Sequence, residues 1–158
     1  MSDFSRQKIK QIRILLGRSP TRLGEGTAES FLLRFVLFEA LVKTVGRYYR
    51  ESVGRVKSSQ VANKESLQTS SVQRWLEHFS IVIHPERIKF ILDSSLRNRG
   101  FKSARALRNG LVHQWDARDA EEAVARFLDL DGAMLVVIEA IEVRARATNS
   151  TLKGMSTP

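Results

Sequence analysis

Apolar side chains recur every three or four positions along most of the chain, a pattern that predicts helices rather than strands. The first long segment of this kind follows Thr27 and runs to about Arg50, and Thr27 is placed to cap it. Its apolar residues form one wide face that we expect to be buried: Phe31, Phe35, Phe38, Leu41, Val42 and Val45.

Two helices are predicted in the middle of the chain. The first has apolar residues at positions i, i+3, i+4 and i+7, which are Val72, Trp75, Leu76 and Phe79. Ile81–Ile83 is a short apolar run that suits an extended segment. Pro85 suits the first turn of the next helix, which is expected to continue to about Ser95.

The last third of the chain predicts a helix on each side of Asp116. Ser103 is placed to cap the first of these, and its inward residues are Ala104, Leu107, Leu111 and Trp115. The second is expected to be one long helix from about Asp119 to Arg146, which Gly132 weakens without ending. Its carboxylates predict a solvated acidic face. Its apolar stripe is Val124, Phe127, Leu128, Leu135, Ile138 and Ile141.

The segments outside these helices are more polar. Ser2–Leu16 predicts a short basic amphipathic helix, and Val53–Ser70 predicts a long mobile loop. We therefore expect an all-α protein, an antiparallel helical bundle over residues 27–147. A basic N-terminal helix and loop would precede it in residues 1–26, and a disordered tail would follow in residues 148–158.

Composition narrows the class of protein and of partner. The chain has 158 residues, enough for one domain, and it has no cysteine, which excludes disulfides and thiolate metal sites. Its apolar runs are too short or too interrupted by charges to span a bilayer, and Met1–Lys10 lacks a secretory signal, so we expect a cytoplasmic protein with no membrane contact. A net charge of +9 favours a polyanionic partner. Residues 85–116 hold seven basic and three acidic side chains, whereas residues 117–158 are net acidic.

Several kinds of functional site are excluded because the sequence lacks the motifs that they require. The chain has no glycine-rich phosphate loop, no Gly-x-Ser-x-Gly elbow and no histidine pair at i, i+4 for a helical metal site. We therefore expect no metal and no cofactor. His84, which precedes a proline, and His78, which lies among aromatic residues, are interpreted as structural.

The remaining candidate chemistry lies in the segment Arg108-Asn109-Gly110-Leu111-Val112-His113. This segment resembles the signature of the HEPN superfamily of ribonucleases, an arginine followed after four to six residues by a histidine, commonly with a polar residue after the arginine. Arg108, Asn109 and His113 match it in the Arg-Asn-x-x-x-His form, on a helix predicted beside the last long helix of an all-α bundle. The resemblance covers about residues 27–147, although only these three residues are diagnostic.

The resemblance implies a fold, a mechanism and partners. HEPN ribonucleases have a four-helix core and act as homodimers in which two motifs meet in one composite cleft. It implies that His113 is a general base or acid, that Arg108 holds the scissile phosphate, and that Asn109 orients the phosphate or His113. The RNA's own 2′-OH is the nucleophile, so no metal is required and DNA is not cut. It also implies a toxin or antiviral defence effector restrained by an antitoxin or another regulatory protein.

Spacing alone leaves the arrangement of these residues open. Arg108 and His113 are five residues apart, about 140° around an ideal helix. Either Arg108 reaches round on its long side chain, or the partner of each residue comes from a second subunit. Glu39 and Lys43 match a Glu-x-x-x-Lys pair that some HEPN ribonucleases carry in an early helix, but this spacing is also that of a common helix-stabilising pair. The residues expected to bind RNA are Arg97, Arg99, Lys102 and Arg105.

Two other interpretations compete with the ribonuclease. The first is a non-catalytic RNA- or protein-binding helical module that uses the basic cluster from Arg97 to Arg108, and it would bind RNA in a strongly salt-dependent way without cleaving it. The second is an adaptor that uses the bundle only to dimerise. In both, Arg108 and His113 are ordinary surface residues.

Overall fold

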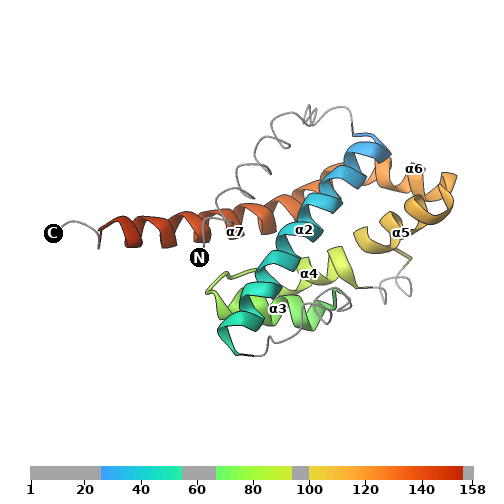
Figure 1. Ribbon diagram of the computed structural model, residues 1–158. Coiled ribbons are helices and arrows are strands. Elements are labelled where there is room, and N and C mark those ends of the chain that lie inside the picture. Colours follow the sequence, from blue (N-terminus) through green and yellow to red (C-terminus); the bar gives the residue numbers. More distant parts are fainter. Residues whose placement is uncertain (1–25, 55–66, 94–99, 155–158) are drawn as a thin grey trace.

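The computed structural model describes residues 26–54, 67–93 and 100–154 (Figure 1). In these ranges every regular element is a helix, which confirms the all-α helical bundle. The expected N-terminal helix Ser2–Leu16 and most of the expected loop Val53–Ser70 lie outside the described residues. The helices are α2 (Ala28–Ser52), α3 (Thr69–His78), α4 (Pro85–Leu92), α5 (Ala104–Gln114), α6 (Ala117–Ala125) and α7 (Phe127–Gly154).

The two longest helices, α2 and α7, pack against each other at the centre of the molecule (Figure 1). α3 packs on α2 and on α4, and α4 also packs on α5 and α7. α5 and α6 lie toward the end where α2 begins (Figure 1). The C-terminal part of α7 extends past the other described helices. α7 continues to Gly154, inside the segment predicted as a tail from residue 148, and residues 155–158 lie outside the description. None of the helices in the described ranges is long and apolar enough to cross a membrane.

The sequence pattern of α2 translates directly into its packing. The threonine before the helix caps it, since Thr27 Oγ1 accepts a hydrogen bond from the backbone N–H of Ser30 at 3.1 Å. All six apolar residues of the predicted face are buried: Phe31, Phe35, Phe38, Leu41, Val42 and Val45.

The C-terminal helix differs from its prediction, because two helices stand where one was expected. The carboxylate of Asp116 accepts hydrogen bonds from the backbone N–H groups of Arg118 and Asp119, at 2.9 and 3.1 Å, so α6 begins before Asp119. The chain then turns at Arg126, whose guanidinium donates to the carbonyl oxygen of Lys102 at 2.8 Å. This break lets α6 pack on α5 while α7 packs on α2.

The buried stripe of α7 is only partly the predicted one, since Phe127, Ile138 and Ile141 are buried as expected. Val124 and Leu128 are exposed and Leu135 is only half-buried. The stripe includes Asp131, and a pattern based on apolar residues alone misses a buried charge. The buried apolar residues between the start of α7 and its middle are Phe127, Leu130, Met134, Val137, Ile138 and Ile141.

Three smaller features of the fold can be compared with their predictions. α3 begins at Thr69, inside the expected loop, and Leu67 just before it is buried. Residues 81–83 form neither a helix nor a strand, although their exposure alternates as in an extended segment. α4 ends at Leu92 rather than near Ser95, because Asp93 already has an extended backbone.

A buried ion pair joins the two central helices. Arg34 of α2 donates from Nε to Oδ1 of Asp131 of α7, and its Nη2 lies 3.5 Å from Oδ2. The two side chains are 4% and 1% exposed, so each charge depends on the other for its stabilisation. The expected solvated acidic face is therefore wrong for Asp131. It is also wrong for Asp119, which is buried and pairs with Lys102 of the segment before α5.

Candidate functional site

The Arg-Asn-x-x-x-His segment lies on α5, as predicted. Ser103 caps this helix, because its Oγ accepts a hydrogen bond from the backbone N–H of Ala106 at 3.2 Å. The helix ends at Gln114, and Trp115 then takes a left-handed conformation with φ of +44°. Trp115 was expected to face inward, but this turn leaves it 52% exposed. The motif therefore occupies the last turns of a short, well-defined helix.

Gly110 lets α5 and α6 approach closely in the middle of the motif. A Cβ atom built at Gly110 would lie 1.7 Å from Oδ2 of Asp119, far inside contact distance. Asp119 is buried and paired with Lys102, so its carboxylate is not free to move aside. As long as Asp119 keeps its position, only glycine fits at residue 110.

Gly110→Ala is expected to lower the free energy of unfolding by about 1–3 kcal/mol, because the added methyl group displaces a buried, ion-paired carboxylate. Gly132→Ala is the matched control, since Gly132 is also helical but has nothing within 4 Å of a built Cβ. This control is expected to stabilise the protein by up to about 1 kcal/mol. Urea unfolding of both variants measures whether the free energy of unfolding falls or rises in each. Equal changes in the two variants would contradict the packing described for Gly110.

Arg108 connects the motif to α2. Its Nη1 donates a hydrogen bond to Oδ1 of Asn109 at 2.9 Å, and its Nη2 lies 3.7 Å from Oε2 of Glu39. The same Glu39 forms an ion pair with Lys43, whose Nζ lies 2.8 Å from Oε1 of the glutamate. The Glu-x-x-x-Lys pair of α2 and the motif of α5 are therefore in contact, which their separation in sequence does not reveal.

His113 and Asn109 face a different space from Arg108. Both line a cavity of about 580 Å³ on the side of α5 that faces α6 and the segment before α5, and Arg108 lies outside this lining. His113 itself is exposed to solvent. Asn109 thus links the two sides, since it accepts from Arg108 and also lines the cavity. Within one chain the helix turns Arg108 and His113 apart, as their spacing indicated.

Of the four residues expected to bind RNA, the structure describes two. Lys102 and Arg105 both line the cavity. Lys102 forms an ion pair with Asp119, and Nη1 of Arg105 donates to the carbonyl oxygen of Leu67 at 2.6 Å. Both cations therefore also hold the local structure. The other two, Arg97 and Arg99, lie outside the described residues.

Sequence reasoning missed the acidic residues of the cavity. Asp116 and Asp119 line it together with the basic side chains. The position of Asp116, directly before a helix that begins Ala-Arg-Asp, is a capping signal that could have identified it. No local signal predicts that Arg105 reaches Leu67, because their contact depends on how the segment before α3 is placed relative to α5.

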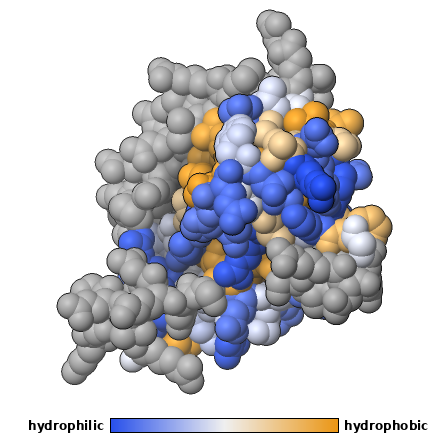
Figure 2. All heavy atoms as spheres, turned by 90° about the vertical axis from the view of Figure 1, so that its right-hand side faces the viewer, coloured by the Kyte–Doolittle hydropathy of each residue, from blue (hydrophilic) through white to orange (hydrophobic). Residues whose placement is uncertain are grey.

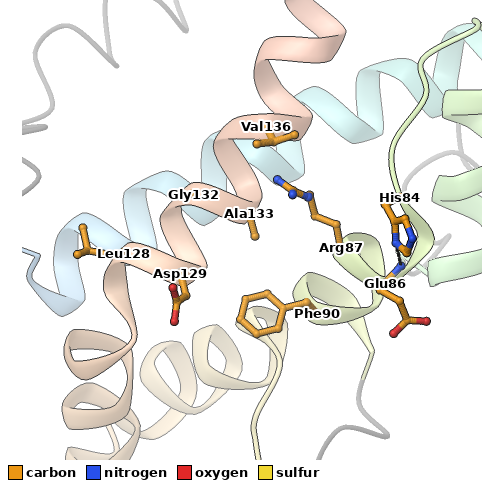
Figure 3. Close-up of a pocket in the computed structure, with 9 residues that line it drawn as sticks. All are labelled: His84, Glu86, Arg87, Phe90, Leu128, Asp129, Gly132, Ala133 and Val136. Atoms are coloured by element: carbon orange, nitrogen blue, oxygen red, sulfur yellow. Dashed lines mark hydrogen bonds between the residues drawn. The ribbon is translucent and has the colours of Figure 1, made fainter.

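A second cavity, of about 610 Å³, lies between α4 and α7 and contains none of the motif residues (Figure 3). His84 stands at its edge and caps α4, because its Nδ1 accepts a hydrogen bond from the backbone N–H of Glu86 at 3.3 Å. The structural interpretation of His84 is confirmed. His78 is likewise structural, since its Nε2 lies 2.8 Å from Oγ of Ser52 and its ring packs edge-on against Tyr49.

The surface over α5 and α6 is mainly hydrophilic. Figure 2 looks onto this end of the molecule and shows polar side chains at its centre with smaller hydrophobic areas between and around them. In the part of the chain that the structure describes, no group of three or more histidine and carboxylate side chains is arranged to hold a metal ion. The side chains that line the cavity and carry chemistry are an imidazole, two amides, a hydroxyl, two cations and two carboxylates.

Comparison of the chain with protein-family models, with curated proteins and with solved structures gives no match. The functional argument therefore depends on the residues of this chain and on their arrangement.

Proposed function

We propose that this protein is a metal-independent endoribonuclease of the HEPN type, which cleaves RNA by attack of the 2′-OH on the adjacent phosphate. The observation that carries the proposal is the contact between Arg108 of α5 and Glu39 of the Glu39–Lys43 pair of α2. Two patterns that occur together in some HEPN ribonucleases lie far apart in this sequence, and they come together at one place in the fold. The exposed His113 and the cavity beside it lie on the same short helix.

In the proposed reaction, His113 accepts the proton of the 2′-OH as its oxygen bonds to phosphorus. The bond from phosphorus to the 5′-oxygen breaks, and the histidine returns the proton to that oxygen. The products are a 2′,3′-cyclic phosphate and a free 5′-hydroxyl. An imidazole suits both steps because it takes up and releases a proton near neutral pH.

The role of Arg108 is to neutralise the phosphate as charge develops on it. Its guanidinium has five N–H donors, and the contacts with Asn109 and Glu39 leave part of them for a ligand. Glu39 and Asn109 hold the guanidinium in position, and Lys43 balances the charge of Glu39. On this view the pair on α2 positions Arg108 and does not touch the RNA.

Because α5 turns Arg108 and His113 apart, we propose that Arg108 of one copy works with His113 of a second copy. A homodimer places two copies of α5 about a two-fold axis, so that each residue meets its counterpart from the other chain. A toxin or antiviral role and an antitoxin or regulatory partner are parts of the same proposal, and they rest on the family resemblance alone. A cytoplasmic location is also proposed, and it rests on the sequence of Met1–Lys10 and on the interrupted apolar runs.

The competing function is a helical module that binds RNA or dimerises without catalysis. One observation favours the dimerising form: the cations beside the motif already have partners inside the chain, Lys102 with Asp119 and Arg105 with the Leu67 carbonyl. This alternative predicts no RNA turnover under any condition.

Mixing two inactive variants tests the proposed site. Arg108→Ala and His113→Ala are each expected to be inactive alone, because each lacks one half of the His–Arg pair. Coexpressed with different affinity tags and purified as the mixed dimer, they are expected to regain cleavage, since one intact pair remains across the interface. The measurement is the release of 2′,3′-cyclic phosphate ends from labelled RNA in EDTA. A mixed dimer that stays inactive while the wild type cleaves would rule out the shared site.

A further inference from the structure

Trp115 is the most unusual residue near the candidate site. It follows the last residue of α5 and takes a left-handed backbone with φ of +44° and ψ of 52°. This conformation is unfavourable for a bulky L-residue, and glycine or asparagine is usual where a helix ends in this way. The chain therefore keeps a tryptophan at a position where its backbone favours a much smaller residue.

The indole remains about half exposed in this conformation. Trp115 is 52% exposed. Within the described part of the chain its side chain has no ring, cation or hydrogen-bond partner. Phe101 is exposed to a similar degree, 54%, but its ring lies 5.7 Å from the guanidinium carbon of Arg126. Trp115 thus differs from the other large aromatic side chain exposed at this end of the molecule.

The position of Trp115 points to the ligand of the candidate site. Its two chain neighbours, Gln114 and Asp116, both line the cavity that His113 and Asn109 also line. Consecutive Cα atoms are about 3.8 Å apart, so the backbone of Trp115 lies at the rim of this cavity, although its side chain is not part of the lining. The end of the molecule formed by α5 and α6 is mainly hydrophilic (Figure 2), although Val112, one helical turn before Trp115, is also 54% exposed. A permanent protein contact would use a larger contiguous apolar patch.

We propose that Trp115 is a stacking platform for an unpaired base next to the scissile phosphate, an inference that rests on the proposed function and specifies its substrate as single-stranded RNA. Proteins that bind single strands combine cations that contact the backbone with aromatic rings on which bases stack. A base in a duplex is already stacked and paired, so an exposed indole gains little from it. Trp115 therefore selects unpaired RNA and adds affinity without taking part in proton transfer.

The test uses the variant Trp115→Gly, which removes the ring and suits the backbone. Because glycine adopts a positive φ without strain, Tm is expected to equal that of the wild type or to exceed it by about 2–8 °C. Kd for single-stranded RNA is expected to rise by roughly 5- to 150-fold, the usual effect of losing one base–aromatic stack. A residue with only a structural role would show the opposite pattern, a lower Tm and an unchanged Kd.

The binding probe is a short single-stranded RNA with 2′-O-methyl ribose at every position, so that no 2′-OH is available for cleavage. The same strand annealed to its complement is the duplex probe. The chain has two tryptophans and Trp75 is 4% exposed, so quenching of the intrinsic fluorescence reports mainly on Trp115. The control variant is Leu128→Ala, which removes another exposed apolar side chain at the separate cavity between α4 and α7.

The expected result is strong quenching by the single strand, weaker quenching by the duplex, and loss of affinity in Trp115→Gly but not in Leu128→Ala. Unchanged single-strand affinity in Trp115→Gly would overturn the proposal. So would dissociation of the homodimer with unchanged RNA affinity, because it would make Trp115 a protein contact. Cleavage of unmodified RNA is measured in parallel. Affinity that depends on Trp115 without any cleavage would contradict the ribonuclease alone, whereas cleavage at sub-saturating RNA that is unaffected by Trp115→Gly would contradict the stacking role alone.

Discussion

Asp131→Ala is expected to lower the free energy of unfolding by about 3–5 kcal/mol, because it leaves the guanidinium of Arg34 buried without its counter-ion. Both side chains are almost fully buried, and the carboxylate is engaged by two nitrogens of the guanidinium. A domain of this size is stabilised by only about 5–15 kcal/mol, so the variant is expected to be close to unfolding at physiological temperature. Urea titration followed by circular dichroism measures the change.

Two further variants separate the unpaired charge from other effects. Glu139→Ala changes an exposed carboxylate on the same helix and is expected to alter stability by no more than about 0.5 kcal/mol. Arg34→Met combined with Asp131→Leu replaces the pair with apolar side chains and is expected to recover most of the loss, since neither charge remains buried. If Asp131→Ala unfolds at the same urea concentration as Glu139→Ala, the ion pair does not hold α2 and α7 together.

The helical bundle could be predicted from the sequence because its buried faces are built mainly from apolar residues at helical spacing. α2 shows this most clearly, since all six residues of the predicted face are buried and Thr27 caps the helix. The pattern failed where a buried position is charged. Asp131 lies on the core side of α7, and a search for apolar residues placed the exposed Leu128 there instead.

The candidate site was only partly predictable for a similar reason. The motif and its place on a helix follow from local sequence, and so does the angular separation of Arg108 and His113. The contact of Arg108 with Glu39 depends on how α5 packs against α2. The exposure of Trp115 depends on a single backbone conformation at the end of α5, which the helical pattern around it does not indicate.

His113→Ala is expected to lower the rate of RNA cleavage by about 10²- to 10⁴-fold, the usual contribution of a general acid–base group. His113 is exposed and near the end of α5, so its loss is expected to change the free energy of unfolding by no more than about 0.5 kcal/mol. The rate is measured with labelled RNA under single-turnover conditions, and light scattering determines whether the variant remains a dimer.

His78→Ala is the matched control for this substitution. It also removes an exposed histidine near the end of a helix, but its ring contacts Ser52 and Tyr49 on the far side of the fold from the motif. We expect a small loss of stability and an unchanged cleavage rate. A similar loss of activity in both variants would show that histidine removal acts through the fold rather than through the site.

The most direct measurement is incubation of the wild type and of His113→Ala with labelled RNA in EDTA, with DNA of the same sequence in parallel. The account predicts that the wild type cleaves the RNA to products with 2′,3′-cyclic phosphate ends, that the DNA stays intact, and that His113→Ala leaves both intact. Full cleavage of RNA by His113→Ala, or no cleavage by the wild type on any single-stranded RNA, would contradict it.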